Sequence, residues 1–287
     1  MSARLPADQD ALAWDDLICR RTGVTLRESQ LPALATLVPS RVAALGLPDA
    51  AAYYERLAAE ADDGSEWTEL MDRLVSHETS FFRHMPTFDA IRTGIVPDLR
   101  ARGRTGASTL TLLSAGCATG QEAYSLAMAA MDTEGAGGRF AVWGADISRR
   151  SIDAARAARY NARAVAAVPP PYRQRFLSAT EEGGRPSYQI APELRQCVRF
   201  TSANLYSPAA MFLNYDVILC QNVLIYFAQR AIPRLVAVLS ARLNAGGYLL
   251  FGPGESPVDC PAGLESINVN GLRAFRRVGR TAVEVRS

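Results

Sequence analysis

The feature that most constrains this sequence is the alternation of apolar, β-prone segments with helix-forming segments after residue 101. Apolar runs such as TLTLLSAG (109–116) and YDVILCQN (215–222) are separated by runs such as EAYSLAMAAM (122–131), whose apolar residues recur at helical spacing. Continuous apolar strands alternating with helices are typical of a parallel sheet that is covered on both faces. The sequence therefore predicts an α/β fold over residues 101–287, with a doubly wound, mostly parallel sheet.

The amino-terminal part has a different character. AAYYERLAAEA (51–61) and SEWTELMDRLVSHE (65–78) consist of good helix formers with helical spacing, and no β-branched alternation interrupts them. We therefore predict an all-helical domain over residues 1–100, ending in a linker. Within the second domain, residues 172–199 contain the turn signal EEGGRP and a short strand, which predicts an inserted β-subdomain. Residues 272–287 alternate around a glycine and are expected to form a hairpin on the sheet edge.

Composition excludes several classes of function. The net charge of +2 is too small to indicate nucleic-acid binding. The five cysteines are scattered without C-x-x-C pairs, and there are only two histidines, so neither a disulfide framework nor a metal site is expected. No uncharged apolar run approaches the length of a membrane span, and the first residues are too polar for a signal peptide. These features predict a cytoplasmic, monomeric protein without membrane insertion.

Small or polar groups follow four predicted strands of the sheet. They are the loop AGCATGQE (115–122), Asp146, the pair Asn204 and Leu205, and the pair Gln221 and Asn222. Ligands of open α/β sheets bind outside the carboxyl ends of the strands, so these groups are expected to meet around one ligand. A carboxylate in the position of Asp146 can accept hydrogen bonds from both hydroxyls of a ribose.

Each group also has a purely structural interpretation. The loop can be an ordinary strand-to-helix turn, Asp146 or Ser148 can cap the next helix, and Asn204 can cap a turn. Glu122 is favoured at a helix start by the helix dipole alone. The loop does not match G-x-G-x-x-G and lacks the Lys and Ser/Thr of a phosphate-binding loop. A ligand with a ribose and an adenine but no phosphate, such as S-adenosylmethionine, therefore fits better than a dinucleotide.

Five motifs in order carry a specific resemblance. They are HETSFFRH (77–84), GCATGQEAYSLAM (116–128), GADIS (144–148), FTSANL (200–205) and LCQNVLIYF (219–227). Together they resemble the CheR-type methyltransferases, which methylate glutamates on bacterial chemotaxis receptors. The resemblance covers nearly the whole chain and implies S-adenosylmethionine as cofactor, S-adenosylhomocysteine as product, and the cytoplasmic helical region of chemoreceptors as partner.

The resemblance also implies roles for individual residues. In the family, the residues that match Thr79 and Arg83 reach the cofactor, Glu122 matches a partner of its ammonium, and Asp146 matches the acid that binds the ribose. The whole implied cofactor site comprises His77, Thr79, Arg83, Glu122, Asp146, Asn204, Leu205, Gln221 and Asn222. Arg83 and Tyr226 are the candidate catalytic residues. Taken alone, FFR would suggest a core aromatic pair beside a solvated Arg, and Tyr226 a core aromatic residue.

This chain departs from the family pattern at His77, where the best-known members have Asn, at Ala123, where Pro is common, and at two further places. Gln221 stands where the family has an Arg, which keeps hydrogen-bonding capacity but removes a permanent charge. Residues 31–47, which are commonly Arg-rich in members that act on receptors, contain Arg41 alone, so electrostatic guidance of an acidic helix is expected to be weaker. Nearby arginines at 20, 21 and 27 can compensate.

The predicted reaction is methyl transfer to a glutamate carboxylate. Because glutamate ionises with a pKa of about 4.3, no strong general base is required at neutral pH. Arg83 and Tyr226 are expected to orient the carboxylate, and catalysis to depend on alignment and desolvation. Two other hypotheses stay open. One is a regulatory module that binds S-adenosylmethionine or its product without transferring methyl groups. The other is a methyltransferase that acts on a non-receptor protein or a small molecule.

Overall fold

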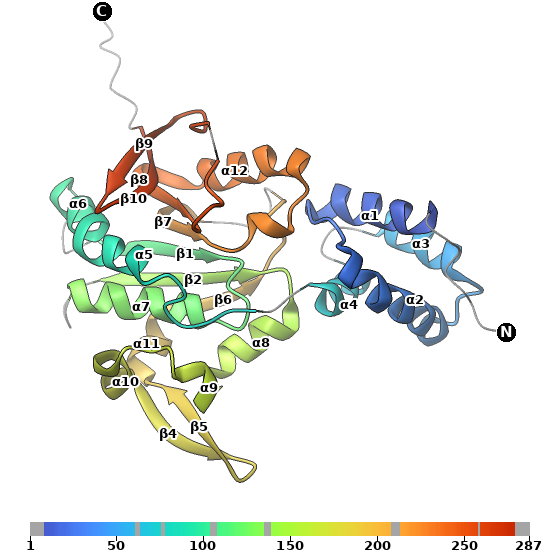
Figure 1. The fold of residues 1–287 in the computed structure, drawn as a ribbon, viewed down its shortest axis with the longest axis horizontal. Helices are drawn as coiled ribbons and strands as arrows, with labels where there is room; N and C mark the ends of the chain where they lie inside the picture. The colour runs from blue at the N-terminus through green and yellow to red at the C-terminus, as the bar shows by residue number, and fades with distance from the viewer. Residues whose placement is uncertain are drawn as a thin grey trace, which may run out of the picture.

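The computed structural model describes residues 9–60, 64–75, 78–103, 108–134, 139–207, 213–257 and 259–278. Its centre is a seven-stranded sheet with the order β6-β2-β1-β7-β8-β10-β9 (Figure 1). The strands are β1 (Leu110–Ala115), β2 (Phe140–Asp146), β6 (Val198–Ser202), β7 (Tyr215–Cys220), β8 (Leu243–Phe251), β9 (Leu264–Val269) and β10 (Leu272–Arg277). The first five strands in that order are parallel, whereas β10 runs antiparallel to both β8 and β9. The predicted α/β class with a mostly parallel sheet is confirmed.

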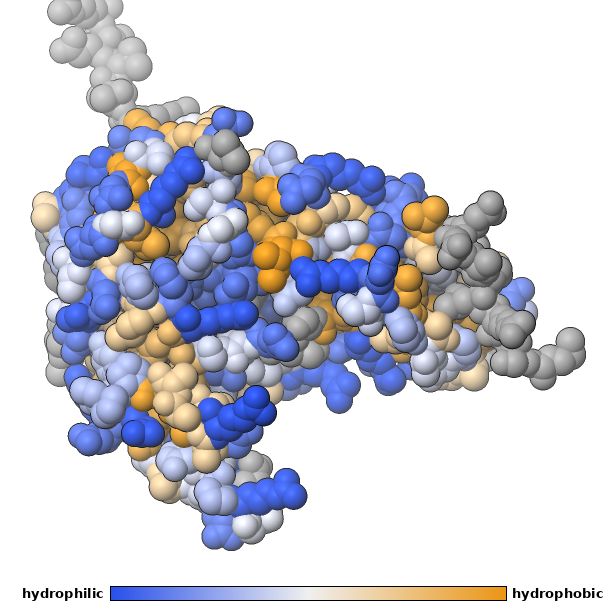
Figure 2. Space-filling view, in the orientation of Figure 1, coloured by the Kyte–Doolittle hydropathy of each residue, from blue (hydrophilic) through white to orange (hydrophobic). Residues whose placement is uncertain are grey.

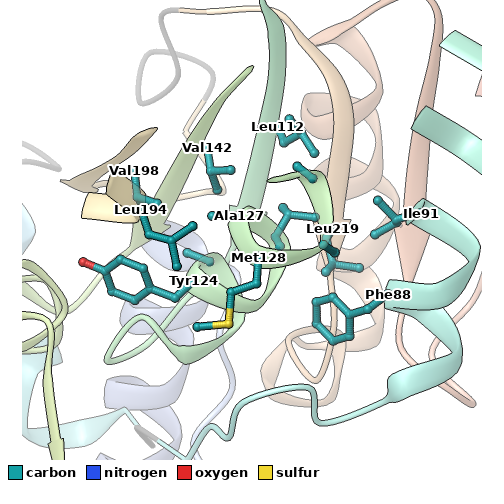
Figure 3. Packing of buried hydrophobic residues seen from close by; sticks show 14 of the residues in the cluster. Phe88, Ile91, Leu112, Tyr124, Ala127, Met128, Val142, Leu194, Val198 and Leu219 are labelled. Carbon is teal, nitrogen blue, oxygen red and sulfur yellow. The ribbon is translucent and has the colours of Figure 1, made fainter. Parts of the chain in front are cut away.

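The continuous apolar strands are explained by burial on both faces of the sheet. All six residues of β7 are buried. Leu112 of β1 packs with α7 (Gln121–Glu134) and with α5 (Met85–Ala90) on one face, as Figure 3 shows for the side chains around Met128 and Phe88. The neighbouring Leu113 packs on the other face, in the cluster that includes α12 (Ile232–Ala241). Successive strand residues point to opposite faces, so two covered faces require a strand without polar alternation.

Four helices form a separate unit beside the sheet (Figure 1). They are α1 (Gln9–Thr22), α2 (Leu31–Leu45), α3 (Ala50–Ala59) and α4 (Ser65–Leu74), with the short η1 (Glu28–Gln30) before α2. Gly46 ends α2 in a left-handed conformation, and Asp49 caps α3 by accepting a hydrogen bond from the backbone N–H of Ala52. Within the described residues no single helix could span a membrane; only α2 with η1, taken together with α3 across an 83° bend, reaches the necessary length and composition.

The next helical segment belongs to the sheet by its packing. It comprises α5, the π-helical turn η2 (Ile91–Ile95) and α6 (Val96–Ala101). These elements contact α7, and α5 also contacts β10, with Ile91 and Ile95 fully buried in the same core as α7. The predicted boundary of the helical domain, at residue 100, differs from the boundary that this packing indicates. We propose that the helical unit ends before residue 78, because the apolar faces of α5–α6 are covered by the sheet domain.

The inserted subdomain is a three-stranded antiparallel sheet with the order β3-β5-β4, which projects from the body in Figures 1 and 2. The insertion contains β3 (Arg159–Asn161), α9 (Ala162–Val165), α10 (Pro170–Phe176), β4 (Leu177–Glu182), β5 (Arg185–Ile190) and α11 (Pro192–Cys197). The predicted range of 172–199 begins too late, because β3 follows α8 (Arg149–Ala157) directly. The predicted range also ends too late, because it includes Val198 and Arg199, which belong to β6.

The carboxyl-terminal hairpin differs from the sequence-based expectation. Its strands are β9 and β10, and they are joined at Asn270 and Gly271, both with positive φ. The glycine around which we expected the turn, Gly279, lies outside the described residues. The second strand of the hairpin inserts between β8 and β9 rather than adding at the edge, because the buried Phe275 packs against the core under β8.

The helical unit is attached to the sheet domain at the start of α8. The buried carboxylate of Asp72 in α4 accepts hydrogen bonds from the Ser148 hydroxyl (2.6 Å) and from the backbone N–H of Arg150 (3.2 Å). These groups lie at the amino terminus of α8, where a negative charge is stabilised by the helix dipole. The contact therefore couples the placement of the two units.

We expect Asp72→Ala to lower the free energy of unfolding by about 1–3 kcal/mol, because it removes the acceptor of the buried Ser148 hydroxyl and of the Arg150 N–H. Denaturant unfolding followed by fluorescence measures this change. Glu69→Ala is the matched control, since Glu69 lies half-exposed on the same helix and pairs with Arg73. An equal loss of stability in the two variants would contradict the docking role.

Candidate active site

A cleft of about 900 Å³, including its open mouth, lies at the carboxyl edge of the central sheet. Every predicted site residue within the described part of the chain lines it: Thr79, Arg83, Glu122, Asp146, Asn204, Leu205, Gln221, Asn222 and Tyr226. His77, the remaining predicted cofactor contact, lies outside the described residues. Groups from positions 79 to 226 of the chain thus meet in one cavity.

The floor of the cleft is the loop between β1 and α7. Gly116 adopts a φ of +79°, and a Cβ atom there would lie 2.4 Å from a methyl group of Val223. Only glycine meets both the conformation and the space without strain. The carboxylate of Asp146 accepts hydrogen bonds from the N–H groups of Ala118 and Ser148, both at 2.9 Å. Asp146 therefore links the ends of β1 and β2, whereas the Ser148 hydroxyl caps α8.

Glu122 is a buried acid beneath this loop. Its carboxylate accepts a hydrogen bond from the Ser114 hydroxyl at 2.7 Å. Burial raises the pKa of Glu122 to about 8, the nearby negative charge of Glu255 raises it further, and the Ser114 hydrogen bond and the charge of Arg83 oppose these effects. A buried carboxyl in this state gains strongly from a cation that enters the cleft.

The raised pKa of Glu122 predicts the pH dependence of stability without ligand. The folded protein binds a proton that the unfolded chain releases near its reference pKa of 4.5, so stability is lost as pH rises from about 4.5 towards 8. The loss is on the order of a few kcal/mol. Thermal unfolding of wild type and Glu122→Gln over this range measures it. The variant has no proton to release and should show the flatter curve; parallel curves would contradict the assignment.

Two amide side chains in the cleft are already engaged with the protein. The Gln221 amide donates to the Thr87 hydroxyl at 2.9 Å, and that hydroxyl also contacts Nδ1 of His84 at 2.8 Å. Asn204 donates to the carbonyl of Arg21 (2.8 Å) and accepts from the N–H of Tyr206 (3.0 Å). The contacts of Asn204 are those of a residue that caps a turn. The hydrogen bond of Gln221 connects the end of β7 to α5.

Arg83 reaches the cleft from an unusual backbone turn. Phe82 has a φ of +48°, its N–H donates to the buried hydroxyl of Ser125 at 3.0 Å, and its ring stacks on that of Tyr172 at 5.0 Å. Arg83 is exposed and donates to the carbonyl of Glu78 at 3.2 Å. The two aromatic residues of FFR are thus core residues, and they anchor the turn that presents the guanidinium.

The helical unit supplies one wall of the cleft, next to Tyr226. Val24 pairs with Phe227 in an antiparallel bridge, and the N–H of Thr25 donates to the carbonyl of Tyr226 at 3.0 Å. The guanidinium of Arg27 lies over the Tyr226 ring, 5.1 Å from its centroid, and donates to the carbonyl of Ile225 at 2.7 Å. The position of the tyrosine is therefore determined by both parts of the chain.

Sequence reasoning missed several residues of this region, of which five are informative. Thr22, Val24, Gln30 and Val75 line the cleft from the helical unit, and Glu255 holds the loop that carries Tyr226. The first four of these residues reach the cleft only because the helical unit packs against the sheet domain. No local sequence pattern predicts this packing. Glu255 could have been found, because it follows β8 in the segment GPGES at the same edge as the other strand ends. Among the described residues, no group of His, Cys, Asp and Glu is arranged to hold a metal ion.

A mostly parallel sheet with an antiparallel strand in the sixth position, an acid at the end of its second strand and a cleft at its carboxyl edge are features of a Rossmann-like nucleoside-binding fold. The family model described as "CheR methyltransferase, SAM binding domain" matches residues 77–269. The chain belongs to this family. The family model describes the matched part of the chain as a domain that binds S-adenosylmethionine.

Similar proteins include both biofilm and chemotaxis enzymes. The "Probable biofilm formation methyltransferase WspC" of Pseudomonas putida is 33% identical over 259 residues, which are 90% of this chain and 59% of the relative. The "Probable chemotaxis protein methyltransferase" of Rhizobium etli is 27% identical over 241 residues, 83% of this chain and 89% of the relative. This chain thus spans about three fifths of the length of the WspC relatives. A solved magnesium protoporphyrin IX methyltransferase from Synechocystis is 16% identical, covers 76% of this chain and 97% of its own, and superposes with a TM-score of 0.37.

The residues of the cleft fit this cofactor. Glu122 is a buried acid in the cleft and can pair with an ammonium group. Gly116 and Asp146 both line the cleft, and a carboxylate at the end of the second strand can accept hydrogen bonds from ribose hydroxyls.

Proposed function

We propose that this protein methylates glutamate side-chain carboxylates on chemotaxis-type receptors and thereby forms glutamyl methyl esters. The observation that carries the proposal is that Arg83 and Tyr226, a guanidinium and a phenol, both line one cleft. A carboxylate substrate is already ionised at neutral pH and needs a cation and a hydrogen-bond donor rather than a base.

The proposed division of labour places the cofactor contacts on the floor of the cleft. Glu122 holds the ammonium, Asp146 holds the ribose, and Asn204 with Leu205 borders the adenine. Bound S-adenosylmethionine supplies an electrophilic methyl group on a sulfonium. Thr79, Gln221 and Asn222 complete the walls, and His77 is proposed to contribute from the segment before Thr79.

Arg83 and Tyr226 are proposed to act on the substrate. The guanidinium of Arg83 attracts and orients the incoming carboxylate, for which its planar donors are suited. The Tyr226 hydroxyl donates to one carboxylate oxygen and leaves the other free to attack. The apolar walls, which include Val24, Val223 and Phe227, exclude water, so that both opposite charges are desolvated when they meet.

A second candidate substrate, a protein other than a chemoreceptor, is favoured by the surface of α2. Arg41 is held by two hydrogen bonds to the buried carboxylate of Glu66, at 2.8 and 2.9 Å, and Tyr53 donates to the same carboxylate. The fully exposed positions of α2 carry no charge: Pro32, Ala33, Ala35, Thr36, Ser40, Ala43 and Ala44. This helix is therefore poorly suited to guide an acidic receptor helix, whereas Arg83 lines the cleft and Arg27 lies over the ring of Tyr226, and both side chains are exposed.

The deciding experiment uses S-adenosylmethionine with a radiolabelled methyl group. The purified protein is incubated with receptor cytoplasmic fragments and, separately, with a lysate of cells that express it. We expect label in the receptor fragments, released as methanol by mild base, as methyl esters require. Base-labile label in other lysate proteins alone would favour the second substrate class. Binding of the cofactor without any transfer would instead indicate a regulatory module.

A further inference from the structure

The carboxylate of Glu255 binds the loop that carries Tyr226. One of its oxygens accepts a hydrogen bond from the N–H of Asn222, and the other approaches the N–H of Ile225 at 3.4 Å. Both N–H groups lie in the stretch from β7 to η4 (Leu224–Tyr226). Asn222 has a φ of +56°, a left-handed conformation that asparagine adopts more readily than most residues. Charge-assisted hydrogen bonds to one carboxylate hold the backbone of the loop in this conformation.

The chain leaves room for this carboxylate by placing a glycine opposite it. A Cβ atom at Gly252 would lie 2.2 Å from the same Glu255 oxygen that binds Asn222, and 3.2 Å from the Asn222 nitrogen itself. Gly252 does not have a positive φ, so its backbone would accept alanine. The Glu255 carboxylate therefore occupies the space that a side chain at position 252 would need.

Glu255 is half-buried behind the cleft, whereas Asn222 and Tyr226 line it. It is also close enough to Glu122 for its charge to act on that carboxyl. A neutral acceptor would suffice for loop stability, and a negative charge here costs desolvation energy and repels Glu122. A negative charge at Glu255 is instead useful if the cleft beside it binds a cation and if the loop that it holds must present Tyr226 in a fixed position.

We propose that Glu255 is a positioning residue for methyl transfer, which fixes the backbone from Asn222 to Tyr226 and so determines where the tyrosine hydroxyl meets the substrate. The proposal rests on the function proposed above for Tyr226. It assigns no contact between Glu255 and the substrate.

The first test measures kcat and KM for Glu255→Ala and Glu255→Gln. We expect kcat to fall at least about tenfold, because small displacements of an orienting group have effects of this size, while KM for S-adenosylmethionine changes less than about threefold. Gln, which can accept only one of the two hydrogen bonds, should lie between Ala and wild type. Glu265→Gln is the matched control. Glu265 lies on the remote strand β9 and pairs with Arg276 of β10. A kcat like that of wild type in both Glu255 variants would overturn the proposal.

A double-mutant cycle tests the mechanism even if one variant is unstable. Gly252→Ala should reduce kcat as Glu255→Ala does, because the added methyl group displaces the carboxylate. In the Glu255→Ala background the same substitution should have little further effect. Multiplicative losses in the double variant would show that Gly252 acts independently of Glu255 and would contradict the proposal. An inactive wild type that still binds the cofactor would instead contradict the proposed function.

A pH profile separates positioning from a general loss of structure. The charges that face Glu122 are those of Arg83 and Glu255, and the neighbouring thiols of Cys117 and Cys220 are buried with pKa values raised well above normal, so they stay neutral. Removing the Glu255 charge lowers the pKa of Glu122. In Glu255→Gln, affinity for S-adenosylhomocysteine should therefore persist to lower pH than in wild type. An unshifted profile would contradict the electrostatic part of the inference.

Discussion

Arg83→Ala should lose methyl transfer almost completely, with a fall of at least about a hundredfold in kcat at saturating S-adenosylmethionine. Arg83 is an exposed side chain at the cleft, and it donates a hydrogen bond to the carbonyl of Glu78. Without its charge, nothing from this turn would offset the desolvation of an incoming carboxylate. Lysine should restore activity only in part, because an ammonium lacks the planar pair of donors.

Steady-state assays of methyl-ester formation measure this effect. Arg92→Ala is the control, because Arg92 lies in the following helical segment and pairs with Asp89 and Asp132 away from the cleft. Arg83 also lowers the pKa of Glu122, so a modest loss of cofactor affinity at neutral pH is expected as well. Turnover like that of wild type in Arg83→Ala would remove Arg83 from the mechanism.

Asp146→Ala should weaken the binding of S-adenosylmethionine at least about a hundredfold. The substitution removes the proposed acceptor for the ribose hydroxyls, and hydrogen bonds to a charged group contribute about 1.5–3 kcal/mol each. It also releases the N–H groups of Ala118 and Ser148, which hold the floor of the cleft. Both effects act on the part of the site that binds the nucleoside.

Calorimetry with S-adenosylmethionine and S-adenosylhomocysteine tests this assignment. The two compounds share the ribose, so their affinities should fall by the same factor, whereas a residue near the sulfur would discriminate between them. Asp153→Ala is the control, since Asp153 is exposed on α8 and pairs with Arg156. A large difference between the two ligands would place Asp146 elsewhere in the site.

The convergence of the candidate residues could be predicted because it follows from parallel topology. The carboxyl ends of parallel strands share one edge, so the groups after β1, β2, β6 and β7 had to meet. The same argument extends to β8 and would have included Glu255, whose segment was not considered as a strand end. Arg83 and Tyr226 were identified only through the family motifs, because FFR and a lone tyrosine have ordinary core interpretations.

Other features depended on contacts between distant parts of the chain. The amphipathic segment that forms α5 and α6 has the helical spacing of α1–α4, and only packing shows that α7 and β10 cover it. β3 is too short to show a hydrophobic pattern. The order of the strands along the chain also does not predict that β10 lies between β8 and β9 in the sheet.

The sequence by itself determined the α/β class and the candidate polar groups at the strand ends, because periodicity and the residues that follow each apolar run are local properties of the chain. Only the tertiary structure decided what those groups touch. Gln221 turns to Thr87, Arg41 is neutralised by Glu66, and Asn222 is held by Glu255. Each of these pairs joins residues that are distant in the chain, and a hydrogen bond between such residues exists only once packing has brought both elements together.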